Sequence, residues 1–290
     1  MIDQAHKLRT LVNKILPPQP RSHAIGPRVI TVTSGKGGVG KTNVAVNLGL
    51  ILARSGRRVL LFDADLGLAN VEVLMGITPP YTLYEFLYGT KSMEEVVYAD
   101  PSGLQIISGG SGICELAQLD SLQRQRILQI LPYLRARTDF VLVDTGAGIS
   151  RDVLGFVAAA EEVVIVITPE PTSLTDAYSL IKVLARFNVH SEARLVVNRA
   201  HDKQEALQAA SKLQLVCSKF LDFKLSYLGE IPEDGAVGQS VKDQKPLVLS
   251  QPYSAAAKSL NQIAGRLVEG KECNPEAAGR FLTRLLRLFG

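Results

Sequence analysis

The chain is poor in the residues that usually build metal and redox sites. Its 290 residues include no tryptophan, three cysteines and four histidines. Cys114, Cys217 and Cys273 lie far apart and form no Cys-x-x-Cys pair, and the histidines show no ligand spacing. The sequence therefore predicts no disulfide framework, zinc site or iron–sulfur site, and it fits the reducing cytoplasm.

The chain also lacks the segments that would carry it into or across a membrane. No apolar run reaches the length that spans a bilayer, and no signal peptide opens the sequence. The formal net charge of +4 is too small to predict nucleic-acid binding by itself. The 46% of hydrophobic residues, by contrast, are enough for a large core.

Short apolar runs alternate with segments of helical periodicity along most of the chain. This alternation predicts an α/β fold: a doubly wound, mostly parallel sheet with helices on both faces. The runs that we expect to form buried strands lie at residues 29–32, 59–62, 104–107, 140–144, 162–167 and 195–197. Helices are expected at residues 120–137, 173–187 and 253–268.

Residues 35–42 read G-K-G-G-V-G-K-T and match the phosphate-binding loop G-x-x-x-x-G-K-[ST]. A predicted strand precedes the loop and an amphipathic segment follows it, which is the context that the motif requires. The glycines let successive N–H groups point at phosphate oxygens, while Lys41 would neutralise the β- and γ-phosphates and Thr42 would hold Mg²⁺. The predicted nucleotide-binding residues here are Gly35, Lys36, Gly37, Gly38, Val39, Gly40, Lys41, Thr42 and Asn43.

Acidic residues end two of the predicted strands, at the edge where parallel sheets bind ligands. Asp63 and Asp65 follow the strand at 59–62, and Asp144 ends the strand at 140–144. Asp144 would hold Mg²⁺, directly or through water. Of the other two carboxylates, one can position an attacking water and the other can support Mg²⁺ through a water molecule.

Lys36 is a second lysine inside the loop, where its positive charge is costly unless a negatively charged group lies beside it. With this lysine the loop resembles the deviant Walker A motif of the MinD/ParA family of ATPases. The resemblance covers residues 29–268 and implies an ATP-dependent sandwich dimer in which Lys36 reaches the partner's nucleotide. It also implies ATP, ADP and Mg²⁺ as ligands, and slow hydrolysis that resets the dimer.

Two further segments resemble the switches of that family. Residues 63–70, D-A-D-L-G-L-A-N, are similar to switch I, which assigns the attacking water to Asp65 with Asp63 assisting. Residues 144–148, D-T-G-A-G, are similar to switch II, in which the Gly148 N–H senses the γ-phosphate. A glycine stands where the family usually has proline, so we expect a looser switch II.

The adenine base is expected beside two later segments. Asn198 follows the strand at 195–197, where an asparagine can both donate to and accept from the adenine edge, as one does in this family. A plain turn role is the alternative for Asn198. Residues 228–234, L-G-E-I-P-E-D, resemble the segment whose backbone closes over adenine. These two segments add Asn198, Arg199, Ile231, Pro232 and Glu233 to the predicted nucleotide site.

Residues 1–16 are expected to form a short amphipathic helix, and residues 17–27 a proline-rich linker. The helix carries D-Q-A-x-x-L-R, which resembles the amino-terminal motif of the FlhG branch of the family, MinD-like regulators of flagellar number. The resemblance implies that this segment stimulates the GTPase FlhF and that flagellar switch components are further partners. The motif residues are Asp3, Gln4, Ala5, Leu8 and Arg9.

Residues 274–290 predict an amphipathic helix with arginines on one side. Because burying its apolar side and ordering the segment nearly cancel, one copy would hold an anionic membrane weakly and two copies in a dimer much better. MinD carries a similar membrane-targeting helix. The alternative is that this side docks on the chain's own domain, even as the resting state of the same segment. The residues assigned to the membrane are Phe281, Leu282, Leu285, Leu286 and Phe289.

The sequence thus predicts an ATPase domain at residues 28–270 between two appendages. We expect an ATP-switched homodimer that cycles between cytoplasm and the inner face of the cell membrane and regulates flagellar placement and number, without direct nucleic-acid binding. A MinD-type division-site protein is one alternative, although the amino-terminal extension argues against it. A ParA-like DNA-partitioning ATPase would need a basic DNA face and no membrane tail. A metabolic ATPase or cluster carrier is the last alternative, and a carrier would need paired cysteines.

Overall fold

The computed structural model describes residues 26–65, 70–109, 120–269 and 276–289. The predicted amino-terminal helix and most of the proline-rich linker lie outside these residues. The strands are β1 (Arg28–Ser34), β2 (Val59–Ala64), β3 (Tyr98–Ala99), β4 (Leu104–Ser108), β5 (Phe140–Ala147), β6 (Glu162–Ile167), β7 (Glu192–Ala200) and β8 (Lys224–Pro232). The longer helices are α2 (Lys41–Arg54), α6 (Ser121–Arg137), α7 (Arg151–Ala159), α8 (Pro171–Arg186), α9 (Lys203–Leu221), α10 (Gly235–Lys242), α12 (Ala255–Val268) and α13 (Ala277–Phe289). The short helices are α3 (Asn70–Met75), α4 (Leu83–Leu87), α5 (Met93–Val96) and α11 (Leu247–Ser250).

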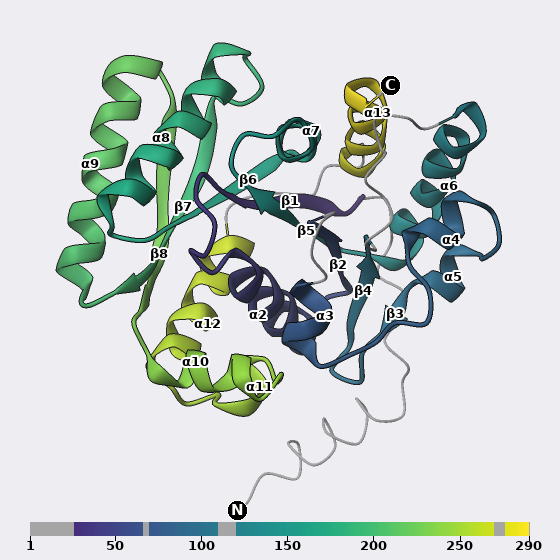
Figure 1. The fold of residues 1–290 in the computed structure, drawn as a ribbon, viewed down its shortest axis with the longest axis horizontal. Helices are drawn as coiled ribbons and strands as arrows, with labels where there is room; N and C mark the ends of the chain where they lie inside the picture. The colour runs from purple at the N-terminus through teal and green to yellow at the C-terminus, as the bar shows by residue number, and fades with distance from the viewer. Residues whose placement is uncertain (1–25, 66–69, 110–119, 270–275, 290) are drawn as a thin grey trace, which may run out of the picture.

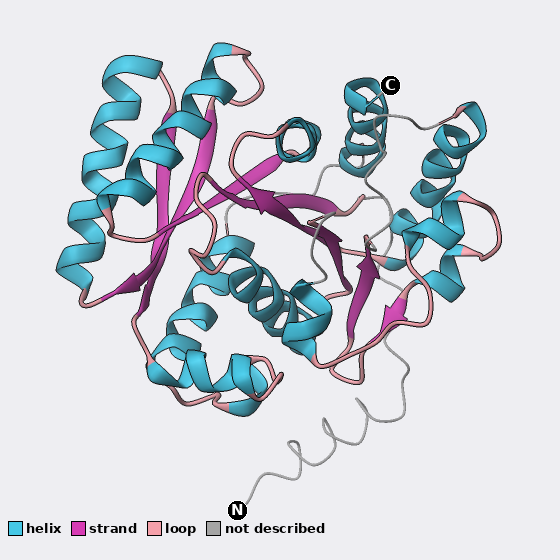
Figure 2. Cartoon of the chain, viewed as in Figure 1, coloured by secondary structure: helices cyan, strands magenta, loops and turns pink. Residues whose placement is uncertain are grey.

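The strands form one eight-stranded sheet in the order β3-β4-β2-β5-β1-β6-β7-β8. All pairings are parallel except the one between β3 and β4. Helices α2 and α12 cover one face of the sheet, and α6, α7, α8, α9 and α13 cover the other (Figures 1 and 2). The predicted doubly wound α/β sheet is therefore confirmed.

Local sequence sets where several helices begin. The side chains of Asp120, Ser150, Asp202 and Ser254 each accept a hydrogen bond from a backbone N–H in the first turn of the helix that follows. Such N-caps satisfy donors that the helix itself leaves without partners. Helix α8 begins instead with Pro171, whose fixed φ angle suits the first helical position.

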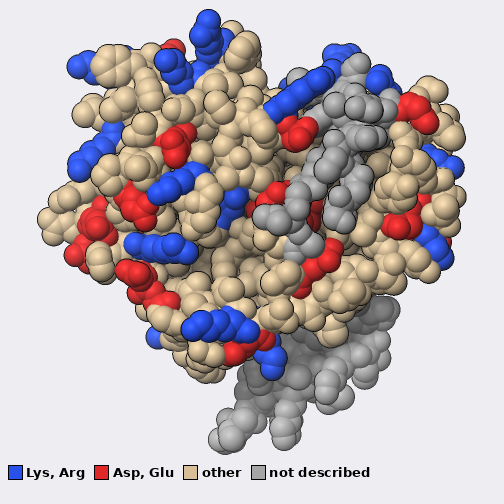
Figure 3. Space-filling model, viewed as in Figure 1, with Lys and Arg blue, Asp and Glu red and all other residues tan. Residues whose placement is uncertain are grey.

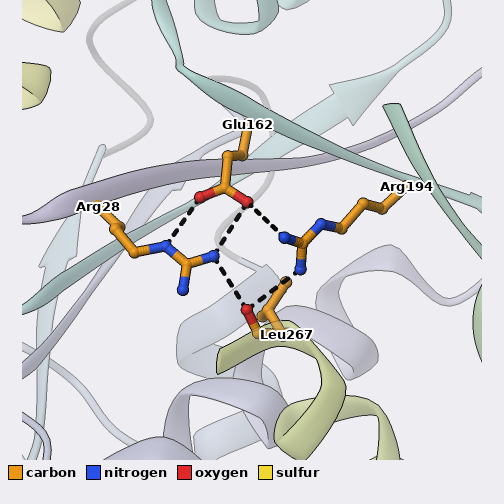
Figure 4. A network of polar contacts seen from close by, with 4 residues as sticks. All are labelled: Arg28, Glu162, Arg194 and Leu267. Carbon is orange, nitrogen blue, oxygen red and sulfur yellow. Dashed lines mark hydrogen bonds and ion pairs between the residues drawn. The ribbon is translucent and has the colours of Figure 1, made fainter. Parts of the chain in front are cut away.

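A buried ion network closes the sheet at the amino-terminal ends of its strands (Figure 4). Arg28 of β1 donates two hydrogen bonds to the Glu162 carboxylate of β6, at 2.8 and 3.0 Å. Arg194 of β7 lies 3.2 Å from the same carboxylate, and both arginines donate to the Leu267 carbonyl at the end of α12. Arg28 and Glu162 are almost fully buried, so water solvates them little and each charge is stabilised by its oppositely charged partner.

Helix α13 lies with its apolar side on the chain's own domain. Phe281, Leu282 and Leu285 are at most 5% exposed and belong to the core cluster shared with α6 and α7. Leu286 packs partly buried against the same cluster, and the Phe289 side chain lies outside the described residues. The structure therefore shows the docked alternative for this segment. Among the described helices, none is long and apolar enough to cross a bilayer.

Candidate functional site

The phosphate loop connects β1 to α2, as its motif predicts. Gly40 adopts a left-handed conformation with φ 91° at the N-cap of α2, and a Cβ there would lie 2.4 Å from the Asn198 side-chain nitrogen. At Gly35 close packing excludes a side chain, because a Cβ would lie 2.2 Å from the Asp176 carbonyl group of α8. The loop is thus shaped both by backbone conformation and by close packing against α8 and β7.

Helix α2 presents the next residues of the motif to the site. Lys41 is buried, while Thr42 and Asn43 are partly exposed at the first turn. The fully buried Asn47 amide donates to the Asn43 carbonyl at 2.7 Å and accepts from the Val248 N–H at 3.0 Å. Asn47 therefore fixes the first turn of α2 against α11, and the sequence motif did not reveal this role.

Asp63 and Asp144 are paired in register on the adjacent strands β2 and β5. Burial, together with the neighbouring Asp144 charge, raises the pKa of Asp63 to about 8. Burial also raises the pKa of Asp144 to about 7, although the nearby Thr42 hydroxyl and Lys41 oppose this shift. Two carboxylates in a site shielded from water therefore hold protons more tightly than free carboxylates do, and a bound cation would oppose this effect.

The donor set around Asp144 fits Mg²⁺. Neither Asp144 oxygen accepts a standard hydrogen bond from the described residues, although the side chain is fully buried. No group of three His, Cys, Asp or Glu side chains suited to a metal exists in the described part of the chain. Mg²⁺ is commonly held by one or two protein oxygens together with substrate phosphates, so Thr42 and Asp144 would hold it beside a bound nucleotide.

The switch I carboxylates have different surroundings. Asp63 accepts hydrogen bonds from the Asp65 and Val71 N–H groups, at 3.1 and 3.3 Å. Residues 66–69 of the predicted switch I lie outside the described residues. Asp65 is only partly buried and accepts from the Asn70 amide at 3.1 Å. Its carboxylate also faces Gly146 of β5. This arrangement suits Asp63 for positioning and leaves Asp65 the more accessible carboxylate for orienting a water molecule.

Switch II is held to the carboxyl end of β1 by a backbone hydrogen bond. The Gly148 N–H donates to the Ser34 carbonyl at 2.9 Å, and Gly148 has φ 93°. In the structure this donor is therefore engaged within the chain, and sensing a phosphate would require it to change partner. The predicted strand at 140–144 continues to Ala147, so most of the segment resembling switch II is an extension of β5.

Lys36 forms an ion pair within its own chain. Its ammonium lies 2.7 Å from the Glu170 carboxylate and donates to the Thr172 hydroxyl at 2.8 Å. This neighbour lowers the pKa of Glu170. Both side chains remain accessible, at 35% and 56% exposure, so water and salt weaken the pair. The sequence did not predict this contact, although Glu170 follows a predicted strand at the correct edge of the sheet.

The residues predicted for adenine meet at the carboxyl ends of β7 and β8. Asn198 pairs in register with Ile231, and Ala200 with Pro232. The Asn198 amide donates to the Val39 carbonyl at 2.7 Å, so it also supports the phosphate loop. Arg199 is exposed with φ 58°, and Glu233 is exposed. Since the Asn198 amide nitrogen is engaged with the loop, its side-chain oxygen is the atom better placed to accept a hydrogen bond from a base.

The two buried carboxylates make the stability of the nucleotide-free protein depend on pH. Both folded pKa values exceed the unfolded value of 3.8, so the folded state binds more protons between about pH 4 and pH 8. Stability should therefore fall as the pH rises through this window, by up to about 1.4 kcal/mol per pH unit for each proton released. Denaturant unfolding from pH 5 to pH 8.5 measures the slope. Asp63→Asn should flatten it, and an unchanged slope would contradict this assignment.

Fold and site together define a P-loop nucleoside triphosphatase. The ParA family model described as "NUBPL iron-transfer P-loop NTPase" matches residues 27–268, and the chain belongs to the MinD/ParA family of P-loop ATPases. Iron transfer is the description of that family model, and this chain has no Cys-x-x-Cys pair.

The similar proteins include flagellar regulators. The chain is 43% identical to "Antiactivator FleN" of Pseudomonas aeruginosa over 83% of this chain and 86% of that protein. It is 32% identical to "Flagellum site-determining protein YlxH" of Helicobacter pylori over the whole of both chains. These relatives place it among MinD-like, FlhG-type proteins.

The solved structures agree with this assignment. MinD of Pyrococcus horikoshii, complexed with Mg-ADP, superposes with a TM-score of 0.67 at 26% identity, over 84% of this chain and 96% of that chain. The MinC:MinD complex of Aquifex aeolicus gives a TM-score of 0.67 at 27% identity, over 84% and 97%. The chain thus belongs to the ATP-binding and ATP-hydrolysing class of P-loop proteins.

Proposed function

We propose that this protein is an ATP-operated switch that regulates the placement and number of flagella from the inner face of the cell membrane. The observation that carries the proposal is the docked α13, an amphipathic helix whose apolar side is buried on the ATPase domain. A helix that is stable in this docked position can be released when another conformation of the ATPase domain binds it less tightly. The similarity to flagellar regulators supports flagellar placement and number as the process that the switch would regulate.

Each of the site residues would have a separate role in ATP hydrolysis. Lys41 would neutralise the β- and γ-phosphates, and Asp65 would orient the attacking water while Asp63 holds the switch I segment. Thr42 and Asp144 would hold Mg²⁺, which neutralises charge on the phosphate oxygens. The backbone N–H groups of residues 35–40 would bind the phosphates. Hydrolysis is proposed to be slow, because its role is to end a signal rather than to make product.

A second copy of the chain would complete the ATP-bound state. Lys36 has enough accessible surface to leave Glu170 and Thr172, and a partner's triphosphate offers more negative charge than one carboxylate. Each copy would then contribute Lys36 to the other's nucleotide. Dimerisation would also bring two α13 helices to the same surface, which raises their joint affinity for lipid through effective concentration.

The docking of α13 is incompletely packed, which suits a reversible contact. An apolar cavity of about 40 Å³ lies beneath the helix. A void of this size costs about 1 kcal/mol. Its lining includes Phe62, Val141, Phe156, Phe281, Leu282 and Leu285. Deleting α13 would uncover this core, so a variant that changes the docking equilibrium is more informative than a truncation.

We expect Val141→Ile to weaken ATP-dependent membrane binding without altering α13 itself. The added methyl group would fill the cavity and stabilise the docked state by up to about 1 kcal/mol, which corresponds to about fivefold weaker vesicle binding. Vesicle sedimentation with a non-hydrolysable ATP analogue measures the effect. Val163→Ile is the matched control, because Val163 lies in the separate core cluster beneath α8 and α9. Equal vesicle binding by Val141→Ile and wild type would count against release of α13.

The flagellar role is proposed to operate through the amino-terminal segment. A peptide covering residues 1–15 should accelerate GTP hydrolysis by FlhF, and exchanging Gln4 and Leu8 for alanine should abolish the effect. These two residues belong to the D-Q-A-x-x-L-R motif, whereas Thr10 and Asn13 lie outside it and provide the control exchange. Absence of acceleration by the unmodified peptide would remove FlhF from the proposed partners and leave flagellar switch components as the candidates.

A further inference from the structure

The outer side of the docked α13 and the end of α6 form a groove rich in arginine. Helix α6 carries four arginines and α13 three, and neither contains an acidic residue or a lysine. The groove between them has a volume of about 390 Å³. It is lined by Arg135 of α6 and, from α13 and the residue before it, by Glu276, Gly279, Arg280, Thr283, Arg284 and Arg287.

Packing brings the Arg135 guanidinium onto the backbone of α13. A Cβ placed on Gly279 would lie 3.5 Å from a Leu131 methyl group and 3.7 Å from an Arg135 side-chain nitrogen. The small residue therefore lets α6 and α13 approach closely, and it sets Arg135 beside the arginines of α13. All four arginines of the groove are exposed. Glu276, its single acid, is paired with Arg280 at 2.7 Å.

We infer that this groove binds the phosphate of anionic lipid headgroups while α13 is still docked. Arginine matches phosphate oxygens with two parallel hydrogen bonds, and several arginines around one groove supply the charge that an anionic surface requires. In Figure 3, Lys and Arg side chains lie at the rim beside α13, and a second group lies over α8 and α9, while the surface between them mixes both signs. A lipid surface therefore fits better than an extended nucleic-acid backbone, which would need a longer basic stripe.

This inference builds on the proposed membrane function but concerns a different state. Release of α13 would let its apolar side enter the bilayer and would depend on ATP. The groove, in contrast, exists in the closed form, so it would hold the nucleotide-free protein at the membrane weakly and reversibly. Arg135 belongs to the ATPase domain and takes no part in the apolar side of α13. Its substitution therefore separates the two modes of binding.

The test is flotation of the nucleotide-free protein with vesicles of phosphatidylcholine, with and without phosphatidylglycerol. We expect binding only to the anionic vesicles, with loss between about 0.05 and 0.5 M salt. Arg135→Gln should bind about fivefold more weakly, the effect of one basic residue at an anionic surface. Arg186→Gln is the matched control, an exposed arginine in the last turn of α8. Unchanged binding by Arg135→Gln, or an equal loss in Arg186→Gln, would overturn the inference.

Two further measurements identify the ligand of the groove and show whether α13 stays docked when the protein binds vesicles. Hydrogen exchange of the vesicle-bound, nucleotide-free protein should leave the amides of α6 and α7, on which α13 rests, as protected as in solution, and loss of protection there would show that α13 has been released instead. Inorganic phosphate and duplex DNA should displace the protein from vesicles poorly at equal phosphate concentration. Efficient displacement by either would assign the groove to a soluble anion or to nucleic acid. None of these results depends on the ATP analogue, so failure here leaves the Val141→Ile test of the proposed function intact.

Discussion

Lys36→Ala is expected to bind ATP but to remain a single chain at concentrations where the wild type dimerises with a non-hydrolysable analogue. Lys41 and the loop N–H groups would still hold the nucleotide, whereas neither copy could donate a charge-assisted hydrogen bond to the partner's phosphates. Because each dimer would be without two such hydrogen bonds, it should weaken by about a hundredfold or more. Light scattering of the protein loaded with the analogue gives the mass directly.

The Glu170→Gln variant provides the opposite test of the same interaction. Glu170 holds Lys36 within the chain, at 2.7 Å, and the amide would retain the shape of the side chain without its charge. Lys36 would then reach a partner's phosphate more readily, so the ATP-bound dimer should form at lower protein concentration. A Lys36→Ala variant that still dimerises with the analogue would remove Lys36 from the interface, whatever Glu170→Gln does.

Glu162→Gln should destabilise the fold by about 3 to 5 kcal/mol, the range found when one partner of a buried ion network is removed. Arg28 donates two hydrogen bonds to this carboxylate, and Arg194 forms an ion pair with it. The amide would leave two buried or half-buried guanidinium groups without a counter-charge. Denaturant unfolding monitored by circular dichroism measures the loss.

Glu276→Gln is the control for this network. Glu276 pairs with Arg280 on the surface, where its side chain is 68% exposed, so the same exchange should change stability by no more than about 0.5 kcal/mol. A loss of less than about 1 kcal/mol for Glu162→Gln would show that water reaches the network and that it does not fasten α12 to the sheet.

The parts of the site that the sequence predicted share a physical reason. Asp63, Asp144 and Asn198 lie near the carboxyl ends of strands of a parallel sheet, and these ends share one edge, so their placement along that edge follows from the order of the elements. The phosphate loop adds the same kind of local information, because strand, glycines and helix follow one another directly. These features needed no knowledge of how distant helices pack.

Other features depended on packing that sequence patterns do not contain. The edge strands β3 and β8 were not predicted, because one has two residues and the other includes the irregular segment before Pro232. Periodicity correctly placed Phe281, Leu282 and Leu285 on one side of a helix, but it could not show whether lipid or the protein's own core covers that side. The Lys36–Glu170 pair likewise joins residues 134 positions apart.

Helix α7 connects the two ends of the proposed switch. It begins at Arg151, three residues after the Gly148 N–H that donates to Ser34, and one of its sides forms part of the surface on which α13 rests. If Gly148 turned from Ser34 to a third phosphate, the first turn of α7 would have to move with it. A shift of this nine-residue helix would then move the surface on which α13 rests, without any rearrangement of the central strands. The protein could thus change the docking of α13 in response to the bound nucleotide while its sheet keeps the same structure.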